Sequence, residues 1–122
     1  MLQEANILTD TVGTDGLVDV SKLATALKVS KAELATAAGL SRDAVSKTAR
    51  VRNRATQTRL RDLVEILNRV RPWAGSLPQA YAWYRAQSLP SYGDQTPEDL
   101  VKRGRAESVK RYLSRIAVGG YA

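Results

Sequence analysis

The sequence predicts an all-α protein, and three observations support this fold class. Apolar residues recur at the three- and four-residue spacing of helices in several segments. These segments begin after Ser, Thr or Asp and end at glycine or proline, as helices commonly do. No segment shows the alternating pattern of a strand. With 122 residues, 43% of them hydrophobic, we expect one compact unit or two small modules that share a core.

The first two helices are predicted after a short arm, residues 1–17, which lacks a sustained period. Apolar positions spaced three and four apart predict a first helix over residues 20–27. Ser30 begins the sequence Ser-Lys-Ala-Glu, a capping box in which serine and glutamate side chains bind the free backbone N–H groups of a helix start. This box predicts a second helix through Ala38, and Gly39 should end it.

The third and fourth helices follow directly. Ser41 is positioned to cap a third helix over about residues 42–50, and a basic bridge, residues 51–54, leads to the next one. The fourth helix, about residues 56–70, has the clearest period in the chain and should be a core helix. Its apolar stripe consists of Leu60, Leu63, Val64, Leu67 and Val70.

Proline and glycine divide the rest of the chain. Residues 72–78 contain three such breakers, and the helix predicted over residues 79–87 carries three aromatic residues that suit a core or an interface. A loop over residues 89–95 precedes a helix that begins at Thr96-Pro97 and ends at Gly104. The last helix should end before two glycines and bury one face, which consists of Val109, Tyr112, Leu113 and Ile116.

The residues needed for most catalysis are missing. The chain has no cysteine and no histidine, which excludes disulfides, thiolate nucleophiles, imidazole bases and the usual zinc ligands. Three serine–lysine pairs, Ser21-Lys22, Ser30-Lys31 and Ser46-Lys47, are direct neighbours, which point away from each other on a helix, and no S-x-x-K is present. Glu98 and Asp99 follow Thr96-Pro97, where acids stabilise a helix start. We expect no enzyme, no cofactor and no metal site.

Targeting signals are also missing from the sequence. No stretch approaches the roughly 20 apolar residues of a membrane span. The opening MLQEANILTD has neither the basic nor the apolar region of a signal peptide. We expect a soluble cytoplasmic protein.

The charge is concentrated in the middle of the chain. The net charge is +7, and residues 41–72 contain 9 basic and 3 acidic side chains, whereas residues 1–40 contain 3 and 5. Such a block is often a solvated helix face, but an excess this localised favours a polyanionic partner, of which nucleic acid is the most common.

Residues 18–72 carry a motif that explains this charge. Two short helices are joined at Gly39, which can adopt a left-handed turn, and Ala35 is small enough for a close helix crossing. Leu40 and Val45 would bury the underside of the second helix. The Ala, Gly-Leu and Val spacing resembles the helix-turn-helix of Xre/Cro repressors. The alternative is a helical bundle in which this turn is only a corner.

In a helix-turn-helix, the second helix presents its first residues to the major groove of DNA. We therefore predict that base edges are read by Ser41, Arg42, Asp43, Ser46 and Lys47. Phosphates would be bound by Arg50, Arg52 and Arg54. Asp43 either reads cytosine or stabilises the helix N-terminus. One position departs from the family pattern, because Thr48 replaces the usual aliphatic residue.

Residues 73–122 carry a second and more specific motif. The resemblance depends on Trp83, the run Leu89-Pro90-Ser91-Tyr92-Gly93-Asp94-Gln95-Thr96-Pro97-Glu98-Asp99-Leu100, Gly104, Val109, Leu113-Ser114-Arg115-Ile116 and Gly119. This segment resembles the toxin-binding domain of the Xre/MbcA/ParS-type antitoxins. The resemblance implies a bacterial type II antitoxin whose partner is a RES-domain toxin that degrades NAD⁺. It also implies a homodimer that binds operator DNA, associates with the nucleoid when bound and represses its own operon.

The predicted toxin-binding residues lie near the end of the chain. They are Trp83, Arg111, Arg115, Gly119, Gly120, Tyr121 and Ala122. The two glycines would let the tail run extended into the toxin's active site, where Tyr121 and the terminal carboxylate bind. The cationic side chains predicted outside the apolar face of the last helix are Arg105, Lys110, Arg111 and Arg115. Alternatively, the tail is a frayed terminus without a role.

A different class of function fits the same sequence. A stand-alone repressor would use its C-terminal half only to dimerise or to sense a ligand. The two hypotheses differ in one observable, because an antitoxin gene should lie beside a reading frame for a toxin.

Overall fold

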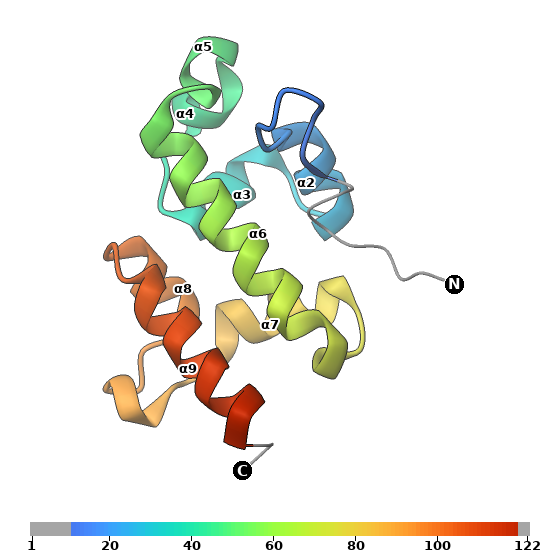
Figure 1. The fold of residues 1–122 in the computed structure, drawn as a ribbon. Helices are drawn as coiled ribbons and strands as arrows, with labels where there is room; N and C mark the ends of the chain where they lie inside the picture. The colour runs from blue at the N-terminus through green and yellow to red at the C-terminus, as the bar shows by residue number, and fades with distance from the viewer. Residues whose placement is uncertain (1–10, 120–122) are drawn as a thin grey trace.

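The computed structural model describes residues 11–119. Its helices are α2 (Val20–Leu27), α3 (Lys31–Ala38), α4 (Arg42–Ser46), α5 (Thr48–Val51), α6 (Arg54–Ala74), α7 (Leu77–Ala86), α8 (Pro97–Lys102) and α9 (Ala106–Gly119), with a 3₁₀ turn at Pro90–Tyr92 (Figure 1). Within these described residues there is no strand, and two isolated antiparallel bridges join Val12 to Val18 and Leu89 to Gln95. The all-α prediction is therefore confirmed. None of the helices in this range is both long and apolar enough to cross a membrane.

Helix α6 is the central helix of the described fold. It runs diagonally between the remaining helices, with α2 and α3 on one side and α8 and α9 on the other (Figure 1). The predicted apolar stripe of this helix is completely buried, together with Ile66. The prediction of its ends was wrong. α6 begins at Arg54, because the Asn53 side chain accepts a hydrogen bond from Ala55 N–H at 2.8 Å, and it continues through Pro72 to Ala74.

Pro72 does not end α6 as predicted, because it lies in the last turn. A proline inside a helix removes one hydrogen bond and crowds the carbonyl four residues before it. Only one position of α6 is affected, and the turn that contains Pro72 packs against α7, where the Trp73 and Trp83 rings meet edge to face at 5.6 Å. Gly75 then caps the helix, with its N–H donating to Arg71 O at 3.0 Å.

The buried side chains form one continuous cluster, which includes residues from both 18–72 and 73–122. Tyr84 on α7 is the largest fully buried side chain, and its hydroxyl donates a 2.6 Å hydrogen bond to Ala37 O on α3. α7 starts at Leu77, two residues earlier than predicted, because Ser76 caps it and Pro78 is tolerated in a first turn. The two halves of the chain therefore share a core.

The two acids at the start of α8 have different environments. Asp99 completes a capping box with Thr96, as the helix-start interpretation predicts, and the Thr96 backbone hydrogen bond lowers the pKa of Asp99. Glu98 is only 5% exposed and forms ion pairs with Arg85 at 2.9 Å and with Lys102 at 3.1 Å. Glu98 is thus part of a packed ion-pair cluster between α7 and α8, which the sequence did not indicate.

The described part of the predicted arm is an ordered loop. Residues 12–18, here called the N-terminal loop, are closed by the Val12–Val18 bridge and by Gly13 N–H donating to Leu17 O at 2.8 Å. Val18 is buried in the core. The first ten residues of the arm lie outside the described range.

Candidate nucleic-acid interface

The residues predicted to form a helix-turn-helix contain two short helices, α3 and α4, joined by a turn at Gly39. Both bonds of the Ser30 capping box are present at the start of α3. Gly39 has φ +73°, a left-handed conformation, and its N–H donates to the end of α3. The Ser41 hydroxyl then accepts from Ala44 N–H at 3.2 Å and begins α4. Three local signals used in the prediction of this turn are therefore confirmed: the Ser30 capping box, the left-handed Gly39 and the Ser41 cap. Val45 is buried as predicted, whereas Leu40 is only half-buried.

The C-terminal end of α3 is enclosed by the other half of the chain. Its carbonyls bind partners from distant helices: Ala37 O accepts from the Tyr84 hydroxyl, and Ala38 O accepts from the Arg59 guanidinium at 3.2 Å. A Cβ atom added to Gly39 would lie 3.1 Å from Lys102 Cα on α8. The turn is therefore fixed by α6, α7 and α8 as well as by its own sequence.

The predicted third helix, residues 42–50, is interrupted. Lys47 is extended, with φ −106° and ψ 122°, and separates α4 from α5. Val45 is buried and Val51 packs against the core. Six residues of regular helix would place these two side chains about 120° apart, because each residue turns the helix by about 100°. The break at Lys47 lets both valines face the core.

All eight residues predicted to bind DNA are exposed along this segment. Five of them surround α4: Ser41, Arg42, Asp43, Ser46 and Lys47. The other three follow the break: Arg50 on α5, Arg52 at its end and Arg54 at the start of α6. The structure thus brings the predicted base-reading and phosphate-binding residues onto one continuous stretch. The position of Asp43 in the first turn of α4 suits either of its two proposed roles.

One charged residue beside this stretch was missed in the sequence. Asp15, at the tip of the N-terminal loop, lies 3.2 Å from Arg52 Nη1. The Leu17 backbone N–H and the Arg52 guanidinium both lower the pKa of this carboxyl group. The sequence Thr-Asp-Gly does predict a turn, but the two charges are 37 positions apart in the sequence, and nothing in it indicated that they would meet.

A pocket of about 370 Å³ lies between the N-terminal loop and the segment α4–α5. Its lining includes Asp15, Ser46 and Arg52, with Val45 and Val51 among its apolar members. The loop therefore borders the surface that carries the predicted DNA-binding residues.

The residues predicted to bind a toxin are only partly described. Trp83 is half-buried against Trp73, which is 37% exposed, and Arg111 is exposed on α9. Arg115 reaches the Tyr92 hydroxyl at 3.5 Å. Gly119 was predicted to lie beyond the last helix, but α9 includes it, so the helix does not break there. Gly120, Tyr121 and Ala122 lie outside the described residues.

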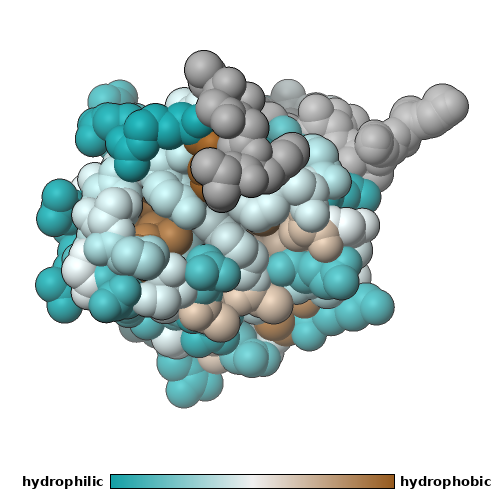
Figure 2. All heavy atoms as spheres, turned by 90° about the horizontal axis from the view of Figure 1, so that it is seen from below, coloured by the Kyte–Doolittle hydropathy of each residue, from teal (hydrophilic) through white to brown (hydrophobic). Residues whose placement is uncertain are grey.

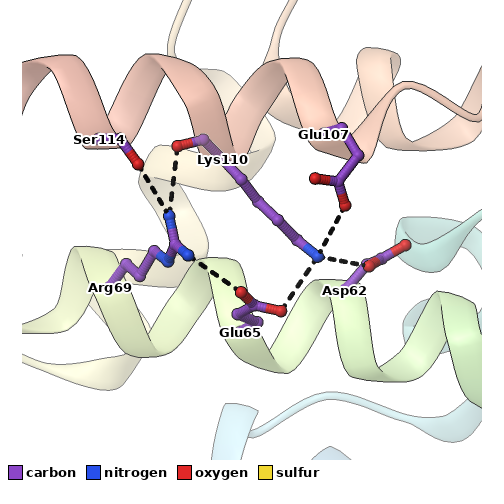
Figure 3. A network of polar contacts seen from close by, with 6 residues as sticks. All are labelled: Asp62, Glu65, Arg69, Glu107, Lys110 and Ser114. Carbon is purple, nitrogen blue, oxygen red and sulfur yellow. Dashed lines mark hydrogen bonds and ion pairs between the residues drawn. The ribbon is translucent and has the colours of Figure 1, made fainter.

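One cation predicted to face outward is turned inward and mostly enclosed instead. The side chain of Lys110 is 13% exposed, and its ammonium group lies 2.8 Å from Asp62, 3.0 Å from Glu65 and 3.2 Å from Glu107 (Figure 3). Burial alone would lower the pKa of Lys110, but the hydrogen bonds that its ammonium group donates to the three carboxylates outweigh burial and hold the pKa above the ordinary lysine value. The prediction was wrong because the lysine stem lies across α6, where the acids are.

Arg69 extends this network along the two helices. Its guanidinium binds Glu65 on its own helix and, on α9, the Ser114 hydroxyl and Lys110 O (Figure 3). The network therefore attaches α9 to α6 through polar contacts, beside the apolar contacts of Val109 and Leu113.

Figure 2 shows the surface of the described residues from below. Hydrophilic and intermediate side chains cover most of it, and hydrophobic ones form small separate patches (Figure 2). Among the residues that the structure describes, no group of three or more acidic side chains is arranged to hold a metal ion.

Compared with protein-family models, with curated proteins and with solved structures, the chain has no significant match.

Proposed function

We propose that the chain is a DNA-binding antitoxin that represses its own operon and neutralises a RES-domain toxin that degrades NAD⁺. The observation that supports the DNA-binding part is the pair of short helices α3 and α4 joined at the left-handed Gly39, followed by exposed basic residues through the start of α6. Helix dipoles, arginines and lysines together attract the phosphate backbone, and the first residues of α4 suit the major groove. The toxin-binding part is supported by the resemblance of residues 73–122.

The first test separates base reading from phosphate binding. Arg42→Ala should weaken binding mainly to the operator, by about 1–3 kcal/mol, because a base contact discriminates between sequences. Arg50→Ala should weaken binding to every duplex and reduce the salt slope by about one unit, because one phosphate contact is lost. Fluorescence anisotropy over a range of KCl concentrations measures both. Equal losses on operator and random DNA for Arg42→Ala would exclude its base-reading role.

The proposed homodimer makes a separate prediction for the operator. Two helix-turn-helix units related by a twofold axis would bind half-sites about 34 Å apart on one face of the duplex. Sedimentation with and without a palindromic duplex measures the stoichiometry. One monomer bound to each palindrome would contradict this arrangement.

The antitoxin part is tested at the chain terminus. Removing residues 120–122 leaves all described helices in place, so DNA binding should be unchanged, while protection against the toxin should be lost if the tail enters the toxin's active site. The measurements are growth and NAD⁺ content of cells that express the product of the neighbouring gene. Tyr121→Ala tests the aromatic anchor alone. Full protection by the truncated chain would assign neutralisation to the surface of α7 and α9.

The second candidate is a stand-alone repressor. One observation favours this candidate, namely that residues 18–72 and 73–122 share a core. Ala37 contacts Tyr84 of α7 and Gly39 lies against Lys102 of α8, so a ligand or partner bound at α7 or α8 could act on the α3–α4 turn. Co-expression and co-purification with the neighbouring gene product distinguish it from an antitoxin.

A further inference from the structure

The N-terminal loop places one carboxylate against the predicted phosphate-binding arginines. Asp15 Oδ1 accepts a hydrogen bond from Leu17 N–H at 3.0 Å, which fixes the side chain within its own turn. Asp15 Oδ2 is then left to bind Arg52 Nη1 at 3.2 Å. The carboxylate is therefore oriented toward Arg52 before the ion pair forms.

The loop is held in place without this ion pair. Gln57, a buried residue of α6, accepts from Val18 N–H at 2.9 Å and donates to Val18 O at 3.4 Å, as a neighbouring strand would. The same Gln57 amide donates to Val51 O at 2.8 Å and so fixes the end of α5. Arg61 also donates to Gly16 O. The loop and α5 are both attached to α6, with Asp15 and Arg52 facing each other.

The ion pair between Asp15 and Arg52 contributes little to the stability of the fold. The two side chains are 49% and 58% exposed, and exposed ion pairs contribute about 0–1 kcal/mol to stability. Arg52, however, is one of the residues predicted to bind phosphate, and a carboxylate offers it the same charge and oxygen ligands as a phosphodiester. Asp15 occupies the position that a phosphate oxygen of DNA would take.

We propose that Asp15 competes with DNA phosphate for Arg52 and so lowers the affinity of the protein for duplexes of any sequence. The inference rests on the proposed DNA-binding function. Binding without sequence preference comes from phosphate contacts and the counterions that they release. Asp15 compensates the charge of Arg52 and occupies one of its N–H donors, so a phosphate that binds Arg52 must displace the carboxylate or share a guanidinium whose charge is already compensated. The contacts of α4 with bases do not pass through Arg52.

The test is anisotropy titration of a random-sequence 30-base-pair duplex over about 50–200 mM KCl. Asp15→Asn keeps the size of the side chain and its bond to Leu17 N–H but removes the charge. We expect about fivefold tighter binding, which is the upper range for an exposed pair, and a salt slope steeper by about one unit. A residue that only held the loop in place would not steepen the salt slope.

Two controls separate competition at Arg52 from a general change of charge. Asp94→Asn, in the loop between α7 and α8, makes the same change of net charge and should alter affinity less than twofold. In the Arg52→Ala background, Asp15→Asn should have no further effect, because the competed group is gone.

Each outcome decides the proposal. Equal effects of Asp15→Asn and Asp94→Asn, or an undiminished effect of Asp15→Asn in Arg52→Ala, would overturn the competition while leaving the proposed function intact. If the wild type and every variant fail to bind duplex DNA while remaining folded by circular dichroism, the proposed function falls, and this inference with it.

Discussion

Replacing Gly39 by alanine should lower the free energy of unfolding by about 2–4 kcal/mol. The left-handed conformation of this residue costs an L-amino acid about 1–2 kcal/mol. The new Cβ atom would also lie 2.5 Å from Arg59 Nη1 and 3.1 Å from Lys102 Cα. Arg59 would have to leave Ala38 O, and the backbone of α8 would have to shift, which adds the cost of overpacking.

Two other glycines serve as matched controls. Gly93 and Gly104 also have positive φ, at 68° and 77°, but no atom lies within 4 Å of a Cβ added to either. Alanine there should cost only the conformational part, about 1–2 kcal/mol. Urea unfolding followed by tryptophan fluorescence measures all three. Equal losses for all three would show that contact between the turn and α8 contributes nothing.

Lys110→Met should destabilise the protein by about 2–4 kcal/mol at pH 7, since it removes the shared cation from three carboxylates and leaves Asp62, whose side chain is only 17% exposed, without it. Lys22→Met, on the exposed surface of α2, is the control and should change stability by less than about 0.5 kcal/mol. The deficit of Lys110→Met should shrink in acid, because protonation removes the repulsion among the three carboxylates.

The stability of the wild type should also change in alkaline solution, and the direction of this change follows from the pKa of Lys110. The pKa of Lys110 is raised in the folded state, so its contribution to stability is complete below the ordinary value of 10.5 and is lost as the pH rises above it. Burial also raises the pKa of Tyr84 above 10.0, which has the same sign. Wild-type stability should therefore fall above about pH 10, and Lys110→Met should show a shallower decline. A parallel decline in both proteins would show that Lys110 does not contribute.

The features predicted from the sequence were those with a local cause. The Ser30 capping box, the left-handed Gly39 and the stripe of α6 each follow from residues within one or two helical turns, and all three are present. The α3–α4 helix pair with its glycine turn and the exposure of the predicted DNA-binding residues could therefore be derived without a structure.

What could not be predicted depends on contacts between distant segments. The extension of α6 through Pro72 accompanies the packing of Trp73 on α7. The side chain of Lys110 is turned inward because Asp62 and Glu65 of α6 lie within ion-pair distance of its ammonium group. The break at Lys47 needs the position of the core on both sides of α4, and the Asp15–Arg52 pair joins residues that only the fold brings together. Sequence periodicity contains no information on such pairings.

The hydrogen bond between Tyr84 and Ala37 limits how this protein can change by recombination of genes. Domains are exchanged readily where few contacts cross their boundary. Here a foreign C-terminal half without a tyrosine at this position would leave a buried carbonyl at the end of α3 without its donor, beside the turn that orients α4. Such an orphaned group costs about 1–3 kcal/mol, a large part of the stability of a small domain. The C-terminal half is therefore changed more easily by substitutions on the exposed surface of α7 and α9 than by its replacement as a whole.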